Sequence, residues 1–597
     1  NNGSFFCMQR LSQYPILTRA QFLSVCFVVF ALTSTNFTFA EPSVVTPETE
    51  QNYTIPAGSL EDALNQFAQQ SDLKLIFDPE IVKDVGTQGL SGNFDIQSGL
   101  NFLLIGSGLQ AVAQDNGYSV IKSQATESMT VLPSIQVAAS SIDRYNATTS
   151  VTATRTNTLL RDVPQSISVL TNELIRDQAV LSLGDAVRYV PGVGVSLGEG
   201  NRDALIFRGN RSTGDFFIDG VRDDVPYFRD LYNTERIEVL KGANGMIFGR
   251  GGSGGVVNRV TKRADWVPSR QISFHGGSFN RKRITADINQ GITDKIAFRL
   301  NAMYEDAGSF RDSVDSRRRG ISPTITFKPT DQTTIIFNME RFHDNRTADR
   351  GIPSFQGGAV NVRRSQFFGD PARSNAEADV LSFNSFIEHK FDFGLTLRNR
   401  TNYAEYDKFY QNVFANGPVS FGEVSLGAYN NATDRKNVFN QTDFLYSLNT
   451  GPVSHTLLAG VEIGRQVTND RRKTGFFQDA NSGERGVNSG STFERVPLGN
   501  PFFTGNIDFR TRDQDANNHS VVDITSFFIQ DQIEILPQLQ AILGVRYDLF
   551  EVDFVKRNGN AVNLKTRDHL ISPRFGLIFK PIEPVSIYAS FSRAFVP

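Results

Sequence analysis

Arginine and aromatic side chains gather beside two glycine turns in the middle of the chain. Arg208 stands between the strand-like Leu205–Phe207 and Gly209. The next such turn ends at Gly220, and the residues after it include Arg222, Tyr227, Phe228 and Arg229. Guanidinium groups suit planar, delocalised oxygen ligands, and aromatic rings add stacking and cation–π contacts. Together they could hold an anionic aromatic ligand, although Tyr227 and Phe228 could equally pack this segment against a wall.

The chain shows no arrangement of residues typical of an enzyme or of a metal site. Its six histidines are scattered without ligand spacing, and no Ser/His/Asp or Cys/His set is evident. The glycine-rich stretch 249–254 lacks both the strand-to-helix context and the lysine of nucleotide sites. We therefore predict no catalytic residues, no cofactor and no metal ligated by the protein, and we expect any metal to arrive inside a chelator.

Composition favours a large β structure. The 597 residues include 49 Phe and 49 Gly but one Trp, and the net charge of −3 gives no bulk electrostatic case for nucleic-acid binding. From about residue 266, apolar and polar residues alternate over segments of ten or more, as in 539–549. This length and period are typical of outer-membrane β-barrels, whereas a soluble sheet would alternate over strands of about 5–6 residues.

The connections between these segments alternate between short and long. Short turns such as Thr293-Asp294 are followed by long polar stretches, which we place at 306–320, 344–378, 407–433, 467–519 and 552–568. In outer-membrane barrels the short turns face the periplasm and the long loops face outward. We count about 13 strands, an odd number, whereas a plugged barrel needs about 22. We therefore expect the chain to be truncated at its C-terminus.

The N-terminal region predicts export. Residues 1–40 combine basic Arg10 and Arg19 with the apolar run Phe22–Leu32 and a cleavage-like Thr38-Phe39-Ala40, which predicts a secretory signal peptide. The alternative is a lipoprotein anchor at Cys26. Because both cysteines lie in this segment, we expect no disulfide in the exported chain.

Three further segments precede the predicted barrel. Residues 52–122 predict a small α/β binding module, with a capping box at Ser59–Asp62 and a hairpin at Asn116-Gly117. Residues 123–155 predict a flexible linker, and residues 156–265 a mixed globular segment with a tightly folded glycine run. The linker contains a peptide that favours an extended form and could add to a partner's sheet, or could simply be idle: Leu132, Pro133, Ser134, Ile135, Gln136 and Val137.

From about residue 52 to its end, the chain resembles TonB-dependent outer-membrane siderophore receptors that carry an N-terminal signalling domain. The motifs similar to that family's plug domain are Asp162–Ser166, Arg188–Val193, Phe207–Gly209, Ile218–Gly220 and Glu235–Thr261. Ala243 departs from the pattern, since many relatives have proline there. The resemblance implies a mainly β fold: a transmembrane antiparallel β-barrel of 22 strands, incomplete at 266–597, around an internal α/β plug domain at 156–265. It also implies a secretin/TonB short signalling domain at 52–122 and a TonB box at 132–137.

The resemblance further implies a function. Such a receptor lies in the bacterial cell outer membrane, with its N-terminal domain in the periplasm, and imports a ferric siderophore with energy from TonB and its inner-membrane motor. Residues 52–122 would contact an anti-sigma regulator. The siderophore, of catecholate type, would be bound by Arg208, Arg222, Tyr227, Phe228, Arg229 and Arg350. The alternatives are uptake of haem, cobalamin or another bulky nutrient, and a sensor that signals without transport.

Overall fold

The computed structural model describes residues 51–122 apart from 57, 72, 84, 88, 95, 105, 106, 108, 115 and 116, and then 145–478, 490–582 and 584–596. The expected signal peptide and the expected TonB box lie outside the described residues. The chain forms two compact units, Asn1–Ser128 and Met129–Pro597. Within the described ranges, no helix has the length and apolar character that a membrane crossing requires.

The N-terminal module, residues 51–122, packs helices against small sheets. Its strands are β1 (Gln51–Ile55), β2 (Gly58–Ser59), β3 (Leu75–Phe77), β4 (Gly86–Thr87), β5 (Leu90–Phe94), β6 (Leu109–Gln114) and β7 (Gly117–Lys122). Its helices are α2 (Leu60–Gln70), α3 (Pro79–Val82) and α4 (Ile96–Leu103). β3 and β7 are parallel, and β6 and β7 form an antiparallel hairpin at the predicted position. The α/β character predicted for this module is therefore present.

Helix α2 supplies much of the module's core. Its apolar face is buried, as its 3.6-residue period predicts, and the ring of Phe67 stacks on that of Tyr53 with centroids 4.6 Å apart. Ser59 is the N-cap residue, but its side chain makes no capping hydrogen bond, so the predicted capping box does not form. The helix is stabilised mainly by packing.

The plug domain of the second unit is built on a five-stranded sheet. In spatial order the strands are β10 (Ile167–Thr171), β16 (Thr234–Lys241), β17 (Gly255–Thr261), β14 (Phe216–Ile218) and β15 (Val221–Arg222). A three-stranded sheet of β11 (Val193–Val195), β12 (Leu205–Phe207) and β13 (Asn210–Ser212) lies within the same domain. The remaining elements are β8 (Thr149–Ser150), β9 (Thr158–Leu159), η1 (Leu160–Asp162), α5 (Asn172–Asp177), α6 (Leu183–Val187), η2 (Gly198–Gly200) and α7 (Gly245–Phe248).

The glycine run between β16 and β17 is tightly folded, as predicted. A Cβ on Gly255, whose φ is 156°, would lie 2.6 Å from the carbonyl oxygen of Leu240 and 2.7 Å from the ring of Phe207. The two strands can therefore approach each other only because this position carries no side chain.

The predicted linker is too long at its C-terminal end. Ser150 is fully buried and its hydroxyl donates to Glu238 at 2.5 Å, while Arg155 pairs with Asp443 of the large sheet at 3.6 Å. The Ser/Thr/Ala composition of 145–155 suggested an unpacked segment, but these small polar side chains are satisfied between the plug domain and the wall. The plug domain therefore begins before residue 156.

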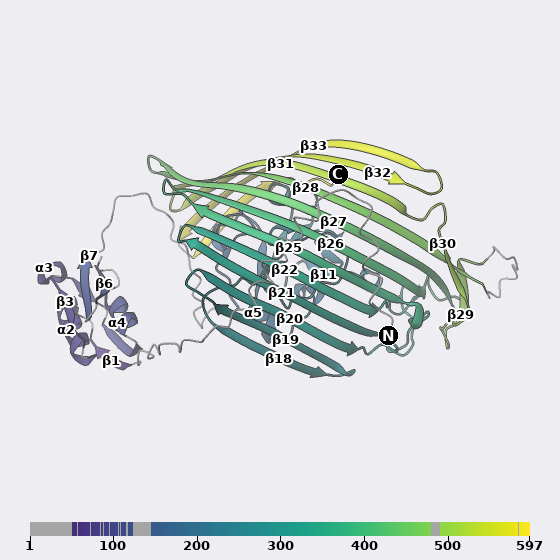
Figure 1. The fold of residues 1–597 in the computed structure, drawn as a ribbon, viewed down its shortest axis with the longest axis horizontal. Coiled ribbons are helices and arrows are strands. Elements are labelled where there is room, and N and C mark those ends of the chain that lie inside the picture. Colours follow the sequence, from purple (N-terminus) through teal and green to yellow (C-terminus); the bar gives the residue numbers. More distant parts are fainter. Residues whose placement is uncertain are drawn as a thin grey trace, which may run out of the picture. The chain divides into compact units, whose positions relative to one another are not determined.

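The large sheet follows the plug domain and is antiparallel throughout (Figure 1). Its path contains 13 strands, the number predicted: β18 (Ser269–Gly277), β19 (Arg281–Gly291), β20 (Ile296–Gly308), β21 (Asp315–Thr330), β22 (Thr333–Thr347), β25 (Asn375–Lys390), β26 (Leu395–Ala415), β27 (Glu423–Thr450), β28 (Val453–Phe477), β31 (Asn517–Leu536), β32 (Leu539–Lys556), β33 (Val562–Ile582) and β34 (Val585–Ser592). Short pieces in the long connections are β23 (Ser354–Phe355), β24 (Gly358–Ala359), η3 (Pro371–Arg373), β29 (Phe493–Pro497) and β30 (Ile507–Arg510).

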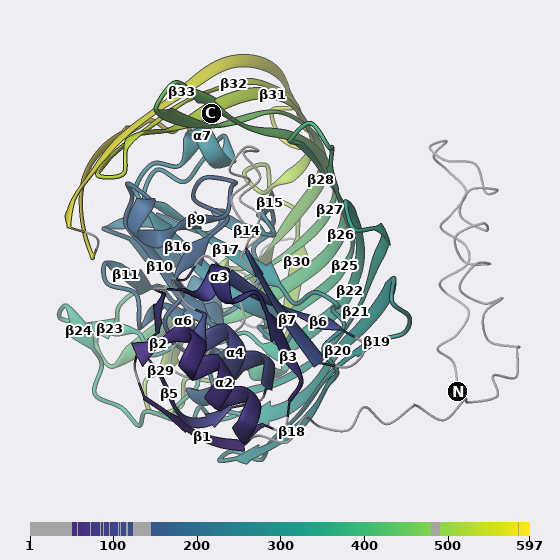
Figure 2. The ribbon, with the colours of Figure 1, turned by 90° about the vertical axis from the view of Figure 1, so that its left-hand side faces the viewer.

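The strands curve around the plug domain, and the first and last strands of the path, β18 and β34, do not pair with each other (Figure 2). Burial on these strands is inverted relative to a soluble sheet. On β32, Leu543 and Val545 are 45% and 40% exposed, whereas Arg546 and Asp548 are 1% and 4% exposed. The apolar side faces outward and the charged side faces the plug domain, which is the pattern of a membrane barrel wall.

The predicted long loops include residues that the structure places in strands. β26 continues to Ala415 and β27 begins at Glu423, so the predicted loop 407–433 is mostly strand. Strand pairing continues here although the outward side chains turn polar, because inter-strand hydrogen bonds do not depend on side-chain polarity. Loss of the apolar stripe therefore marked the edge of the hydrophobic band, not the end of the strand.

We predict that Phe67→Ala destabilises the N-terminal module alone. Removing a fully buried ring that stacks on Tyr53 should cost about 3–5 kcal/mol. Hydrogen exchange of the full chain checks this: amides of α2 should exchange faster, while those of β31 and β32 should not change. Faster exchange in the large sheet, or unchanged exchange in α2, would contradict the independence of this core.

Candidate functional site

The loop between β11 and β12 carries a glutamate from the plug domain to the wall. Glu199 has a φ of 57°, and its neighbours Gly198 and Gly200 have φ values of 62° and 70°. Such left-handed geometry is easy for glycine and strained for glutamate. A Cβ on Gly200 would collide with the backbone of Asp349, in the connection between β22 and β25. The loop therefore lies in direct contact with that connection, at the rim that carries the long loops.

The carboxylate of Glu199 is held by three side chains. Tyr429 donates to Glu199 Oε2 at 2.6 Å, Arg202 Nη1 donates to the same oxygen at 3.2 Å, and Arg350 Nη2 lies 3.2 Å from it. Burial alone would raise the pKa of Glu199, but the hydrogen bonds from Tyr429 and Arg202 and the charge of Arg350 outweigh it and lower the pKa to about 2. Glu199 is therefore an anion at neutral pH.

Arginine and aromatic side chains surround this carboxylate in what we term the rim cluster, made of Arg350, Phe414, Tyr429 and Arg472. The Arg350 guanidinium lies 3.7 Å from the centroid of the Phe414 ring, and that of Arg472 lies 3.8 Å from the centroid of Tyr429. The side chains of Arg350 and Arg472 are 20% and 43% exposed. Two solvent-reachable guanidinium groups on aromatic faces suit an anion with planar, aromatic oxygen donors.

Of the six predicted ligand contacts, the structure brings only Arg350 into the rim cluster. Arg208 lies on the turn between β12 and β13, exposed and with a φ of 47°. Phe228 is half-buried, with the guanidinium of Arg346 4.1 Å from its ring centroid. Arg222 is 8% exposed and donates to the carbonyl oxygens of Gly214 and Arg250.

Tyr227 and Arg229 are buried at the junction of plug domain and wall. Arg229 is fully buried, donates to Asp223 Oδ2 at 2.8 Å, and lies over the rings of Phe216 and Tyr227 at 4.2 and 4.4 Å. The ring of Tyr227 packs near Tyr406 of the wall, with centroids 6.1 Å apart. This geometry supports the packing interpretation of Tyr227, and a ligand contact by either residue stays a prediction.

Sequence reasoning missed Glu199, Tyr429, Phe414 and Arg472. Gly198-Glu199-Gly200 offered a weak local signal, a charged residue between glycines outside a strand. The other three belong to β26, β27 and β28, far from the plug domain in sequence, and only strand register brings them beside it.

Buried charges join the plug domain to the wall below the rim cluster. Asp230 lies 2.7 Å from Arg283 and 2.9 Å from Arg318. Asp224 lies 2.6 Å from Arg435. Burial opposes ionisation of both carboxylates, but the neighbouring guanidinium groups outweigh it and lower the pKa of each to about 2.

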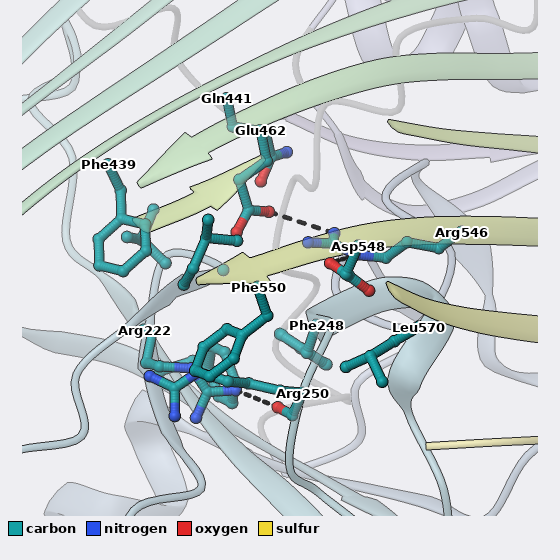
Figure 3. A pocket seen from close by; sticks show the side chains of 15 residues that line it. Arg222, Phe248, Arg250, Phe439, Gln441, Glu462, Arg546, Asp548, Phe550 and Leu570 are labelled. Atoms are coloured by element: carbon teal, nitrogen blue, oxygen red, sulfur yellow. Dashed lines mark hydrogen bonds and ion pairs between the residues drawn. The ribbon is translucent and has the colours of Figure 1, made fainter. Parts of the chain in front are cut away.

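A narrow cavity between plug domain and wall has the same charged character. Arg222 and Arg250 approach it from the plug domain, and Glu462 and Arg546 from the wall (Figure 3). Arg546 Nη1 lies 3.2 Å from Glu462 Oε2. Its charged groups already have partners, so the cavity belongs to the plug–wall contact.

One group of potential metal ligands lies close together in the described part of the chain: His343, Glu377 and Asp379, on β22 and β25. Asp379 already accepts from Arg341 at 2.8 Å and lies 3.3 Å from His343 Nδ1. The three side chains are half-buried, and Asp379 already has partners of its own, so we assign no metal to this group.

Family comparisons match the two parts of the second unit. A model described as "TonB-dependent Receptor Plug Domain" matches residues 159–256, and one described as "TonB dependent receptor-like, beta-barrel" matches residues 320–597. The chain is a TonB-dependent receptor with plug and β-barrel domains. It is a bacterial outer-membrane β-barrel receptor and belongs to a family of transporters, not of enzymes.

Curated relatives of the receptor are described by the metal chelates they receive. It is 28% identical to the probable TonB-dependent siderophore receptor PiuA of Acinetobacter baumannii, over 82% of this chain and 68% of the relative. It is 26% identical to the metal-pseudopaline receptor CntO of Pseudomonas aeruginosa (79% and 66%) and 28% identical to the catecholate siderophore receptor Fiu of Escherichia coli (66% and 53%). The chain thus spans about half to two thirds of the length of these relatives.

Solved structures share the receptor's fold. The siderophore receptor PiuA of Acinetobacter baumannii matches with a TM-score of 0.66 at 26% identity, over 74% of this chain and 66% of that one. The ferripyoverdine receptor of Pseudomonas aeruginosa matches with a TM-score of 0.66 at 20% identity, over 92% and 71%. The matched share, 92% of this chain, is larger than the share that the plug domain and the large sheet make up together. The likeness of fold therefore extends into the N-terminal module.

We predict that Asp223→Ala destabilises the plug domain from within, because both arginine partners of Asp223 belong to the same domain. Asp223 pairs with Arg229 at 2.8 Å and with Arg259 at 2.9 Å, and both guanidinium groups are buried. Leaving them without a counter-charge should cost about 3–5 kcal/mol. Thermal unfolding of the purified receptor in detergent checks this, with Asp523→Ala as the control, since its pair with Arg465 is exposed and worth at most about 1 kcal/mol. Equal effects of the two substitutions would contradict the prediction.

We predict that the plug–wall contact tolerates acid down to about pH 4. The pKa values of Asp224 and Asp230 are depressed from 3.8 to about 2. Their contribution is therefore complete above pH 3.8 and is lost as pH falls toward 2. When the unfolding temperature is measured from pH 8 to pH 2, it should fall below pH 4. Part of that fall should come from protonation of Asp224 and Asp230. In an Asp224→Asn, Asp230→Asn variant that fall should be smaller; an identical fall would contradict the assignment.

Proposed function

We propose that this receptor binds a ferric siderophore at the rim cluster and imports it with energy supplied by TonB. The observation that carries the proposal is the rim cluster itself: two guanidinium groups on aromatic faces, reachable from solvent, beside a loop of the plug domain. The descriptions of PiuA and Fiu as siderophore receptors support the same ligand class, and that of Fiu supports a catecholate.

Import requires the plug domain to move, because its sheet fills the space that the wall strands curve around (Figure 2). The contact between them includes ion pairs and hydrogen bonds, such as Asp230 with Arg283 and Tyr232 with Glu340, beside two small apolar clusters. Water entering the lumen can replace such partners one at a time. We propose that TonB pulls on residues 132–137 and that this force breaks the ion pairs in sequence.

The N-terminal module supports a second role within the same function. It forms a separate compact unit with its own core, and the ferripyoverdine receptor structures share the fold over a span that includes it. We propose that it is a periplasmic signalling domain that reports ligand binding to an anti-sigma regulator. A metallophore other than a siderophore is the alternative ligand, because CntO is described as a metal-pseudopaline receptor.

We predict that a double variant, Arg350→Ala with Arg472→Ala, takes up ligand less well and keeps the fold intact. Each lost charge-assisted contact should cost about 1–2 kcal/mol, so half-maximal growth should need at least ten times more chelate. A strain lacking the gene is complemented with the full-length wild type, with this variant, or with the control Arg363→Ala, whose exposed guanidinium lies 3.6 Å from Asp312. Growth is measured with the metal supplied as ferric catecholate, ferric hydroxamate or metallophore chelates.

Two outcomes of this experiment would contradict the proposed function. Equal growth with and without the gene on every ferric chelate would refute siderophore uptake, and growth restored only by the metallophore chelate would favour the alternative ligand.

Deleting residues 132–137 should abolish growth while the receptor still binds its chelate. Undiminished growth with failed reporter induction would instead indicate a sensor.

A further inference from the structure

We propose that Glu199 is a built-in competitor of the ligand: its carboxylate occupies the rim cluster when the receptor is empty, and an anionic chelate must displace it to bind. This inference rests on the proposed function and concerns the same site. It assigns Glu199 as the residue that selects for ligand charge and that reports ligand binding to the plug domain.

The first argument is that Arg350 of the rim cluster is already engaged by an anion. Glu199 accepts from Tyr429 at 2.6 Å and lies 3.2 Å from Arg350. Arg350 also donates to the hydroxyl of Tyr429 at 2.8 Å, so carboxylate, guanidinium and phenol form a closed triangle. An oxygen anion of the ligand that approaches Arg350 therefore competes with Glu199 for both donors.

The second argument is that this arrangement is accessible and unbalanced in charge. The side chain of Glu199 is 34% exposed, which is unusual for a structural ion pair at a plug–wall contact, where Asp230 and Asp223 are almost fully buried. Arg202, Arg350 and Arg472 lie at the site, and the acids paired with them are Glu199 and Asp515. The excess positive charge favours replacing one carboxylate by a ligand with several negative charges.

The third argument is that backbone strain and charge coincide in one residue. Glu199 keeps a left-handed φ of 57° between two glycines, and the loop touches Asp349 at Gly200. Its pairing with Arg350 and Tyr429 offsets that strain. Once a ligand takes over these two partners, Glu199 keeps only Arg202 and the hydrogen bond from Tyr410 to its carbonyl oxygen, so less interaction energy offsets the strain and the loop can relax more readily.

The fourth argument is that the loop connects directly to the buried charges of the plug domain. Asp203, four residues beyond Glu199, accepts from the backbone N–H of Arg229 at 3.0 Å and lies 3.5 Å from its guanidinium. Arg229 in turn is bound to Asp223. Relaxation of the loop therefore acts on buried ion pairs within the plug domain and, through Asp223, on the hydrogen bond that Asp223 accepts from Tyr406 of the wall at 3.0 Å.

The ligand class follows from what displacement requires. A chelate with several negative charges on planar aromatic oxygen donors can bind Arg350 and Arg472. Its charge then replaces that of the Glu199 carboxylate when Glu199 leaves. A neutral chelate would break the Glu199 contacts without replacing the charge. Glu199 thus selects for strongly anionic chelates and disfavours neutral ones.

The test is Glu199→Gln in the full-length receptor, a change that keeps the shape of the side chain and removes its charge. The probes are the iron(III) complex of 2,3-dihydroxybenzoate, which is anionic, and a neutral iron(III) trihydroxamate, with binding measured by fluorescence quenching. We expect the variant to bind the anionic probe roughly five- to tenfold more tightly and the neutral probe within about twofold of wild type. The matched control is Asp312→Asn, an exposed rim carboxylate paired with Arg363, which should change neither Kd by more than about twofold.

A second measurement needs no ligand. Hydrogen exchange at the amides of Gly200 and Asn201, which donate to Leu197 and Gly198, should be faster in empty Glu199→Gln than in empty wild type. Adding the anionic probe to wild type should raise exchange to the level of the variant. Unchanged exchange in the empty variant would overturn the coupling of charge to the loop.

The outcomes separate this inference from the proposed function. If wild type binds the anionic probe but Glu199→Gln binds it equally or more weakly, Glu199 is a structural partner and the inference fails while the function stands. If neither protein binds any iron chelate, both fail. Equal tightening by Asp312→Asn would show a general charge effect and would also overturn it.

Discussion

Asp230 of the plug domain lies between Arg283 and Arg318 of the wall, and this kind of contact is the constraint on which the second unit depends. A barrel wall with apolar residues outside must place its polar residues inside. On β19 and β21 that rule buries Arg283 and Arg318, which are 5% and 7% exposed. A buried guanidinium is costly without a counter-charge. The wall therefore requires a partner within the space it encloses, and the plug domain supplies much of that charge.

This division of labour explains why the contact can be both specific and reversible. The plug domain has an apolar core of its own, which includes Leu170, Val187 and Ile237. Its contact with the wall combines ion pairs and hydrogen bonds, whose partners water can replace, with two smaller apolar clusters around Tyr227 and Val221. Separating plug and wall exposes these smaller clusters, whereas unfolding the plug domain exposes its larger core. A pulling force should break the first contact more easily than the second.

The sequence predicted the architecture well because the strongest constraints on it are local. Alternation along each strand and turn chemistry gave 13 strands and the hairpin of the N-terminal module. The boundaries at the outer rim were missed because pairing of β26 with β27 continues where the apolar stripe ends. The sequence pattern predicted the strands of the wall, but it did not predict how far they extend beyond the hydrophobic band.

The ligand site was harder to predict, and Arg229 shows why. An arginine beside aromatic residues in a plug loop is suited to an aromatic anion, but the same chemistry lets it stack on Phe216 and Tyr227 of its own domain and pair with Asp223. Only the tertiary fold distinguishes the two cases. Arg350 lies in the connection between β22 and β25, and the structure places it in the rim cluster, where its contact with a ligand stays a prediction.

Glu199 could not be found from composition or spacing, because its role depends on partners more than 150 residues away. The glycines on both sides permit a left-handed loop, but they do not reveal which wall residues the loop meets. Register places Tyr429 there, while the β22–β25 connection places Arg350. Glu199 is a strained anion held by an accessible cation, Arg350, and a second anion that binds Arg350 can displace it. At this rim, backbone geometry and electrostatics therefore favour the same event, in which the loop moves when its counter-charge is taken.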